Sequence, residues 1–117
     1  MKYIAILLIL FSASASAEWT SADTTRQAIF TGVLALDWAQ TRYIAKHPDE
    51  FNEINTILGY RPTPGRVDGY FASSALIHVG ISYLLPDRYR RVWQNVSIGF
   101  EAGIVARNIN LGVGFSF

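Results

Sequence analysis

Several polar side chains stand inside otherwise apolar stretches, and their types could support acid–base or metal chemistry. His78 has Ser74 and Ser82 four residues to either side, and Asp37 and Glu101 interrupt two other apolar stretches. A histidine with two carboxylates can bind a metal such as zinc. A histidine beside a carboxylate and a serine can form an acid–base or nucleophilic site. Ionisable groups inside a membrane also serve proton or ion transfer, which is a third interpretation of the same residues.

The spacing of these residues matches no established catalytic or metal-binding motif. There is no His-x-x-x-His pair, and the three candidate ligands Asp37, His78 and Glu101 come from separate parts of the chain. The sequence also contains no glycine-rich phosphate loop, HExxH or GxSxG motif. We therefore predict no metal and no cofactor. The interpretation that we favour is that these groups hydrogen-bond to one another and fix the register of packed helices.

The polar residues form one stripe on each predicted helix, and we call the whole set the polar seam. Because lipid cannot satisfy polar groups, the stripes of a membrane bundle must face one another. The seam therefore predicts a structural or interaction role, with a membrane-embedded enzyme or a proton or ion carrier as alternatives. Its members are Asp37, Gln40, Thr41, Ser74, His78, Ser82, Glu101 and Asn108.

A polar connection over residues 48–66 carries a second candidate group, the loop motif Glu53 and Asn55. With Glu50 and Asn52, these side chains could coordinate a hard cation. The stretch lacks the order of acidic residues and glycine that a calcium loop requires. We expect the loop motif to be solvated or to cap a turn.

Hydrophobic periodicity predicts three helices and therefore an all-α chain. Asp23 is the predicted N-cap of the first helix, and Thr63 before Pro64 is typical of an N-cap followed by a first helical residue. The predicted helices cover about residues 24–47, 64–85 and 90–107, followed by an extended tail over 108–117.

The C-terminal part has an alternative interpretation as strands. Apolar and polar residues alternate over 97–104 and again over 109–117, which is typical of a β-hairpin. The favoured fold is a small membrane-embedded three-helix bundle with an extended C-terminal tail. The alternative is two helices plus a C-terminal β-hairpin.

The N-terminus and the composition predict where the protein is located. Residues 1–17 combine Lys2, an apolar run and a small-residue cleavage pattern, as a signal peptide does, which leaves a single domain over 18–117.

Residues 67–85 are the best candidate for a membrane span. Arg88, Arg90 and Arg91 after this stretch are interpreted as juxtamembrane charges. A net charge of +1 argues against a nucleic-acid binder, which usually carries a concentrated basic face, and the absence of cysteine excludes disulfides.

Two sequence patterns resemble a known group of proteins. The stretch from Asp37 to Arg42 reads D-W-A-Q-T-R, and residues 53–59 read E-I-N-T-I-L-G. They resemble small uncharacterised membrane proteins of Gram-negative bacteria and their phages, in which proline commonly stands where this chain has Thr56. The resemblance implies an envelope membrane protein.

These observations together predict a protein of the bacterial cell envelope. The expected partners are the lipid bilayer and either a second copy of the chain or another envelope protein, with no nucleic acid. The inner membrane is the favoured location. The alternative is an outer-membrane component whose C-terminal hairpins oligomerise.

Overall fold

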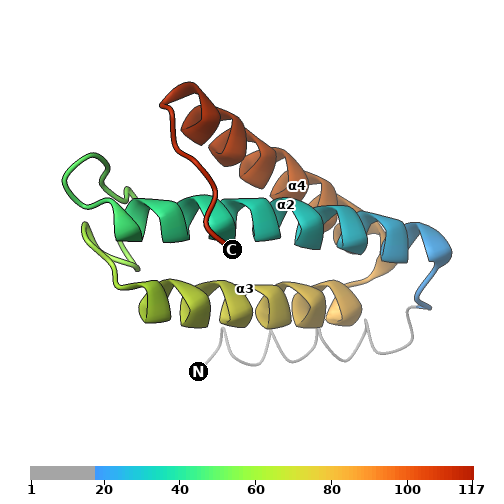
Figure 1. The fold of residues 1–117 in the computed structure, drawn as a ribbon. Coiled ribbons are helices and arrows are strands. Elements are labelled where there is room, and N and C mark those ends of the chain that lie inside the picture. Colours follow the sequence, from blue (N-terminus) through green and yellow to red (C-terminus); the bar gives the residue numbers. More distant parts are fainter. Residues whose placement is uncertain (1–17) are drawn as a thin grey trace.

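The computed structural model describes residues 18–117, so the predicted signal peptide lies outside the described residues. The helices are α2 (Ser21–Lys46), α3 (Pro64–Leu84) and α4 (Asp87–Asn110), and these hundred residues contain no strand. Figure 1 shows α3 running antiparallel beside α2. α4 runs back along α2 and stays in contact with it as far as Asn108 in its last turn. Contacts between α3 and α4 are sparse, so α2 is the common support of the bundle. The prediction of an all-α chain is confirmed.

Local sequence chemistry accounts for where the first two helices begin. Thr20, not the predicted Asp23, is the N-cap of α2, and the two residues form a capping box. The predicted cap of α3 is confirmed, because the Thr63 side chain accepts a hydrogen bond from the Arg66 backbone and Pro64 follows as the first helical residue.

The β-hairpin alternative for the C-terminal part is wrong. Residues 87–110 form one helix, so the segment over residues 96–105 is helical. The physical reason is that Gln94, Glu101 and Asn108 recur every seven residues and so lie on one face of a helix toward α2, where they find polar partners. The helix also continues past the predicted end at 107. It stops where Gly112 adopts a φ of +82°, a conformation that glycine adopts without strain.

The C-terminal tail folds back across α2, as Figure 1 shows. The backbone N–H of Ser116 donates to the carbonyl of Ala39 over 2.9 Å, and Lys46 Nζ donates to the Ser116 hydroxyl over 2.7 Å. Val113, which belongs to the tail, is buried. Gly114 lies directly on the Tyr43 ring, where an added Cβ would come within 2.8 Å of a ring carbon. The tail is therefore a packed element of the bundle.

Replacing Gly114 with alanine is expected to destabilise the fold by about 1–2 kcal/mol, because the new methyl group must displace the Tyr43 ring or the tail. The matched control is Gly69→Ala on α3, where a Cβ meets nothing within 4 Å. That change should stabilise the helix by up to about 1 kcal/mol. Thermal unfolding followed by circular dichroism compares the two variants. Equal melting temperatures would contradict the packed tail.

The apolar core is small and lies mainly between α2 and α3. Its buried members are Phe30, Leu34, Leu58, Val67 and Phe71. Among the helices of residues 18–117, none combines the length and the apolar composition needed to cross a bilayer. The sequence-based choice of residues 67–85 as a membrane span is therefore not supported.

Candidate functional site

The interior of the bundle is as rich in polar side chains as in apolar ones. Its polar groups gather in two places along α2. We call the first the Arg90 cluster, made of Asp23, Arg26, Gln27, His78, Arg90 and Gln94, and the second the acid cluster, made of Asp37, Thr41, Glu53 and Glu101. Of the predicted polar seam, His78 belongs to the first cluster, and Asp37, Thr41 and Glu101 belong to the second.

A fully buried ion pair forms the centre of the Arg90 cluster. Arg90 Nη1 lies 2.9 Å from Asp23 Oδ2, and both side chains are 0 % exposed. The remaining guanidinium donors reach backbone carbonyls, at 2.6 Å from Ser82, 3.1 Å from Tyr83 and 3.0 Å from Glu18. Arg90 therefore joins the start of α4 to the last turn of α3 and the first turn of α2. The sequence interpretation placed Arg90 among exposed charges, whereas the side chain is buried and paired with Asp23. Arg88 and Arg91 are exposed.

A chain of side-chain hydrogen bonds leads from Arg26 to His78. Arg26 Nε donates to Gln94 Oε1 over 2.8 Å, Gln94 Nε2 donates to Gln27 Oε1 over 3.3 Å, and Gln27 Nε2 lies 3.0 Å from His78 Nδ1. Because a guanidinium can only donate, each amide in the chain has one possible orientation. His78 Nδ1 is therefore the acceptor, and the neutral ring carries its proton on Nε2.

The His78 ring lies between two aromatic side chains. Its centroid is 3.5 Å from that of Phe30 and 4.9 Å from that of Trp93, with interplanar angles of 15° and 22°. The ring is 4 % exposed, and its Nε2 atom is buried without a partner. The predicted seam residue Ser82 donates to the His78 carbonyl over 2.8 Å, while Ser74 lines the cavity next to the ring. His78 is thus fixed in orientation and left with one free donor.

The acid cluster joins α2 to α4 through two carboxyl groups. Asp37 is 6 % exposed and accepts a hydrogen bond from the Thr41 hydroxyl over 3.2 Å. The carboxyl group of Glu101 lies within hydrogen-bonding reach of Asp37. Two adjacent negative charges in a buried place repel each other strongly, so the pair holds one proton between them.

A neutral pair of seam residues continues the α2–α4 contact. Asn108 Nδ2 donates to Gln40 Oε1 over 3.1 Å, and Gln40 Nε2 donates to the Val105 carbonyl over 3.1 Å. Both side chains are buried. Each polar atom named here has a partner, so this part of the seam acts as a register lock between helices.

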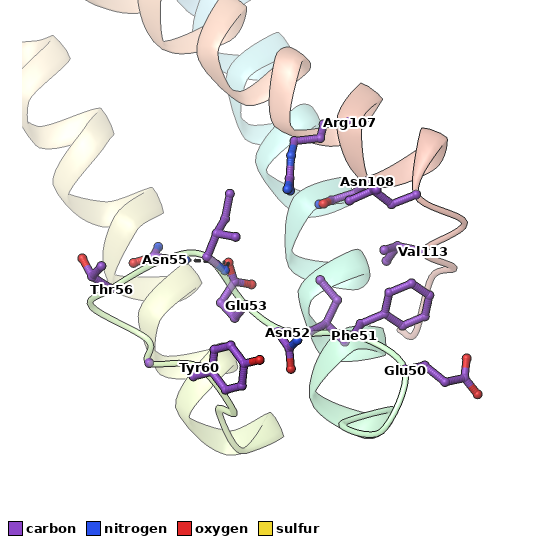
Figure 2. A pocket seen from close by; sticks show the side chains of 14 residues that line it. Glu50, Phe51, Asn52, Glu53, Asn55, Thr56, Tyr60, Arg107, Asn108 and Val113 are labelled. Carbon is purple, nitrogen blue, oxygen red and sulfur yellow. Dashed lines mark hydrogen bonds between the residues drawn. The ribbon is translucent and has the colours of Figure 1, made fainter.

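The loop motif reaches the seam. Figure 2 shows the loop that carries Glu53 and Asn55 facing Arg107 and Asn108 at the end of α4. Two cavities, of about 720 Å³ and about 340 Å³, are lined by residues of this loop. Glu53, Asn55 and Asn108 line both cavities, and the smaller one also contains Asp37, Thr41 and Glu101.

Within the loop, the motif residues cap the turn as expected. Glu53 Oε1 accepts the backbone N–H groups of Ile54 and Asn55, each over 2.9 Å, and Asn55 Oδ1 accepts that of Ile57 over 2.9 Å. Burial raises the pKa of Glu53; the nearby charge of Asp37 also raises it, while the hydrogen bonds from Asn55 and Ile54 lower it.

Replacing Glu53 with glutamine is expected to flatten the dependence of stability on pH. A raised folded-state pKa means that the folded chain binds the Glu53 proton more tightly than the unfolded chain, so stability falls as the pH rises above the ordinary glutamate pKa of 4.5. Glutamine keeps an oxygen for the two turn N–H groups and removes this loss. Melting temperatures of both proteins between pH 4 and 8, measured by circular dichroism, should diverge with increasing pH, the variant being the more stable. Parallel curves would contradict the assignment.

The described residues, 18–117, contain no group of three histidine, aspartate or glutamate side chains placed to hold a metal ion. The chemistry that the geometry does offer is hydrogen bonding and proton sharing. Comparison with protein-family models, curated proteins and solved structures finds no match to this chain. The resemblance to small envelope membrane proteins therefore stays a prediction.

The sequence interpretation missed most of the Arg90 cluster. One available signal is spacing, because Gln27 and Asp23 precede Phe30 and Leu34 on the same face of α2. Another is that Arg90 precedes the polar stripe residue Gln94 by one helical turn. Both spacings predict that these side chains face the interior. The presence of a charged residue near a helix end would not predict this by itself.

Proposed function

We propose that this chain is a small integral membrane protein of a bacterial envelope, with a structural or interaction role. The observation that carries the proposal is the distribution of side chains: polar groups make up about half of the interior, and many large apolar groups lie on the outside. Leu76 and Ile77 on α3 are 72 % and 61 % exposed, and Val96 and Phe100 on α4 are 66 % and 67 % exposed. A monomer in water rarely exposes contiguous apolar surface of this kind.

The charges of the helices support the same proposal. Residues 27–41 of α2, 69–84 of α3 and 92–106 of α4 contain no Lys or Arg, and their two acids, Asp37 and Glu101, face each other inside. Each stretch covers about 22 Å or more at about 1.5 Å per residue. Charged groups pair at both ends of this uncharged band, Arg90 with Asp23 at one end and Arg42 with Asp68 at the other.

The interior then has a defined role in a lipid environment. Helices in lipid gain little from burying apolar surface against one another, so van der Waals packing and polar contacts determine how they associate. The Arg90 cluster and the Gln40–Asn108 pair supply such contacts between helices. A bundle locked in this way presents a fixed apolar surface to lipid or to another envelope protein.

Fractionation of cells that express the untagged chain tests the proposal. We expect the chain in the membrane pellet, resistant to carbonate at pH 11 and released by detergent. Peptide mass spectrometry then reports whether the mature chain begins at Glu18, and a density gradient separates inner from outer membrane. Recovery in the soluble fraction, or release by carbonate, would contradict the proposal.

The acid cluster supports a second candidate function, transfer of protons or other cations. The specific observation is the shared-proton pair Asp37 and Glu101 beside a cavity that Glu53 also lines. In liposomes that contain a pH-sensitive dye, the wild type should then dissipate an imposed pH gradient faster than Glu101→Gln. Empty liposomes give the baseline rate. Dissipation at the empty-liposome rate would contradict this candidate and leave the structural role.

A further inference from the structure

We propose that one end of the bundle is an interaction surface for anionic lipid headgroups and faces the cytoplasm. This loop end consists of the last turn of α2, the loop over residues 47–63, the first turn of α3 and the last turn of α4. Figure 1 shows these parts at the end opposite the turn between α3 and α4. The proposal rests on the proposed membrane location and adds to it the orientation of the chain and the chemistry of its lipid contacts.

Along the sequence, the basic residues of the described chain are divided almost evenly between the two ends. The loop end has five, namely Arg42, Lys46, Arg61, Arg66 and Arg107, and the opposite end has four, namely Arg26, Arg88, Arg90 and Arg91. In membrane proteins an excess of Lys and Arg on one side sets the orientation. A count along the sequence therefore leaves the orientation undecided.

The fold commits three of these arginines to contacts within the protein. Arg90 and Arg26 both pair with Asp23, and Arg90 is fully buried. Arg42 pairs with Asp68 between α2 and α3. The side chains of Arg26 and Arg42 are only 19 % and 17 % exposed. None of the three is free to bind a headgroup.

The charges that stay exposed differ between the two ends. At the opposite end, two exposed arginines are balanced by two exposed acids; the four residues are Arg88, Arg91, Glu18 and Asp87. At the loop end, four exposed cations stand against two exposed acids; these residues are Lys46, Arg61, Arg66, Arg107, Asp49 and Glu50. The third acid of the loop, Glu53, is half-buried and accepts two backbone N–H groups of its own turn. The loop end therefore presents an excess of exposed positive charge, and the opposite end does not.

An excess of exposed cations next to an uncharged band fits a surface of anionic lipid headgroups. Arg61 and Arg107 in particular form no ion pair with any residue of the described chain, 18–117. Figure 2 shows the Arg107 side chain directed from α4 toward the loop. The negative surface potential of a cytoplasmic leaflet attracts cations of this kind. The signal peptide predicted over residues 1–17 indicates the same orientation, because its cleavage leaves Glu18, at the opposite end, outside the cytoplasm.

Single cysteines at the two ends test the orientation, because the chain has no native cysteine. Ile57→Cys lies in the loop and Tyr89→Cys in the first turn of α4, where the native side chains are 69 % and 55 % exposed. Spheroplasts that express either variant are treated with a maleimide that cannot cross the membrane. We expect labelling of Tyr89→Cys in intact spheroplasts, and of Ile57→Cys only after lysis. The reverse pattern, or labelling of neither position before lysis, would overturn the proposal.

Carbonate extraction of the same samples distinguishes a failure of this proposal from a failure of the membrane location. Labelling of both positions in intact spheroplasts, with a chain that resists carbonate, would mean that the chain has no fixed orientation and would overturn this proposal alone. Labelling of both positions with a chain that carbonate releases would contradict the membrane location as well.

The lipid chemistry is tested on the purified full chain in detergent by native mass spectrometry. The probes are phosphatidylglycerol and phosphatidylcholine with the same acyl chains, so that only the headgroup differs. We expect the wild type to retain phosphatidylglycerol about tenfold more strongly, as the two excess cations of the loop end allow. Equal retention of the two lipids would overturn the proposal.

Two matched double variants locate the lipid surface. Arg61→Gln with Arg107→Gln removes the excess positive charge of the loop end and should abolish the preference for phosphatidylglycerol. Arg88→Gln with Arg91→Gln removes the same number of exposed cations from the opposite end and should keep it. Should either variant fail to fold, the wild-type comparison of the two lipids still decides. A preference that survives in the first variant, or is lost in the second, would overturn the proposal.

Discussion

Replacing Arg90 with methionine is expected to destabilise the fold by about 3–5 kcal/mol, the usual cost of removing one partner of a buried ion pair. The change leaves the Asp23 carboxylate buried, with Arg26 as its remaining charged partner. It also removes the donors that reach the Ser82, Tyr83 and Glu18 carbonyls. Methionine can fill part of the volume but can satisfy none of these acceptors.

The neighbouring residue is the matched control for this prediction. Arg91 forms an ion pair with Asp87 at 3.5 Å, and both side chains are more than half exposed. Arg91→Met should cost less than about 1 kcal/mol. Chemical unfolding of both variants, followed by circular dichroism, gives the two free energies of unfolding. Similar losses in the two variants would show that burial of the Asp23–Arg90 pair does not account for its contribution to the free energy of unfolding.

Replacing Leu76 with arginine is expected to oppose membrane insertion by about 2.5–3.5 kcal/mol, the cost assigned to arginine near the centre of a membrane helix. Leu76 is 72 % exposed and lies in the part of α3 that contains no Lys or Arg. In lipid the new guanidinium would be poorly solvated. In water the same change would be nearly neutral, because it buries nothing.

The control for Leu76→Arg is Ile57→Arg. Ile57 is a comparably exposed apolar residue, at 69 %, but it lies in the loop between α2 and α3. Membrane pellets prepared from cells that express each variant should lose most of the Leu76→Arg protein and keep the Ile57→Arg protein. Equal membrane levels of the two variants would contradict a lipid-facing α3.

Helix positions were predictable from the sequence where local chemistry determines them. The Thr63–Pro64 pair fixes the start of α3 because both preferences act within one turn. Alternation alone could not decide between helix and hairpin for residues 96–105. The polar spacing from Gln94 to Asn108 decides it, because only a helix directs these residues toward α2.

The arrangement of the polar groups was less accessible from the sequence. The sequence identified Asp37, His78 and Glu101 as inward-facing, but not that the polar interior has two centres. From the sequence, Arg90 is indistinguishable from a surface charge, because its partner Asp23 lies far away along the chain. Only the fold brings the two residues together. Glu53 reaches the acid cluster only because the loop folds back over α2 and α4. Contacts of this kind depend on the packing of the helices, which no local pattern encodes.

Spin labelling of single cysteines tests most directly whether the apolar outer surface of the bundle faces lipid. The chain contains no native cysteine, so each label is attached at one position only. Labels are placed at Leu76→Cys on the α3 surface and at Ile57→Cys in the loop, and the protein is reconstituted in liposomes. We expect the label at position 76 to be accessible to oxygen, which concentrates in lipid, and protected from a water-soluble nickel complex. The label at position 57 should show the opposite. Equal access of the nickel complex to both labels would contradict a lipid-facing apolar surface over a polar interior.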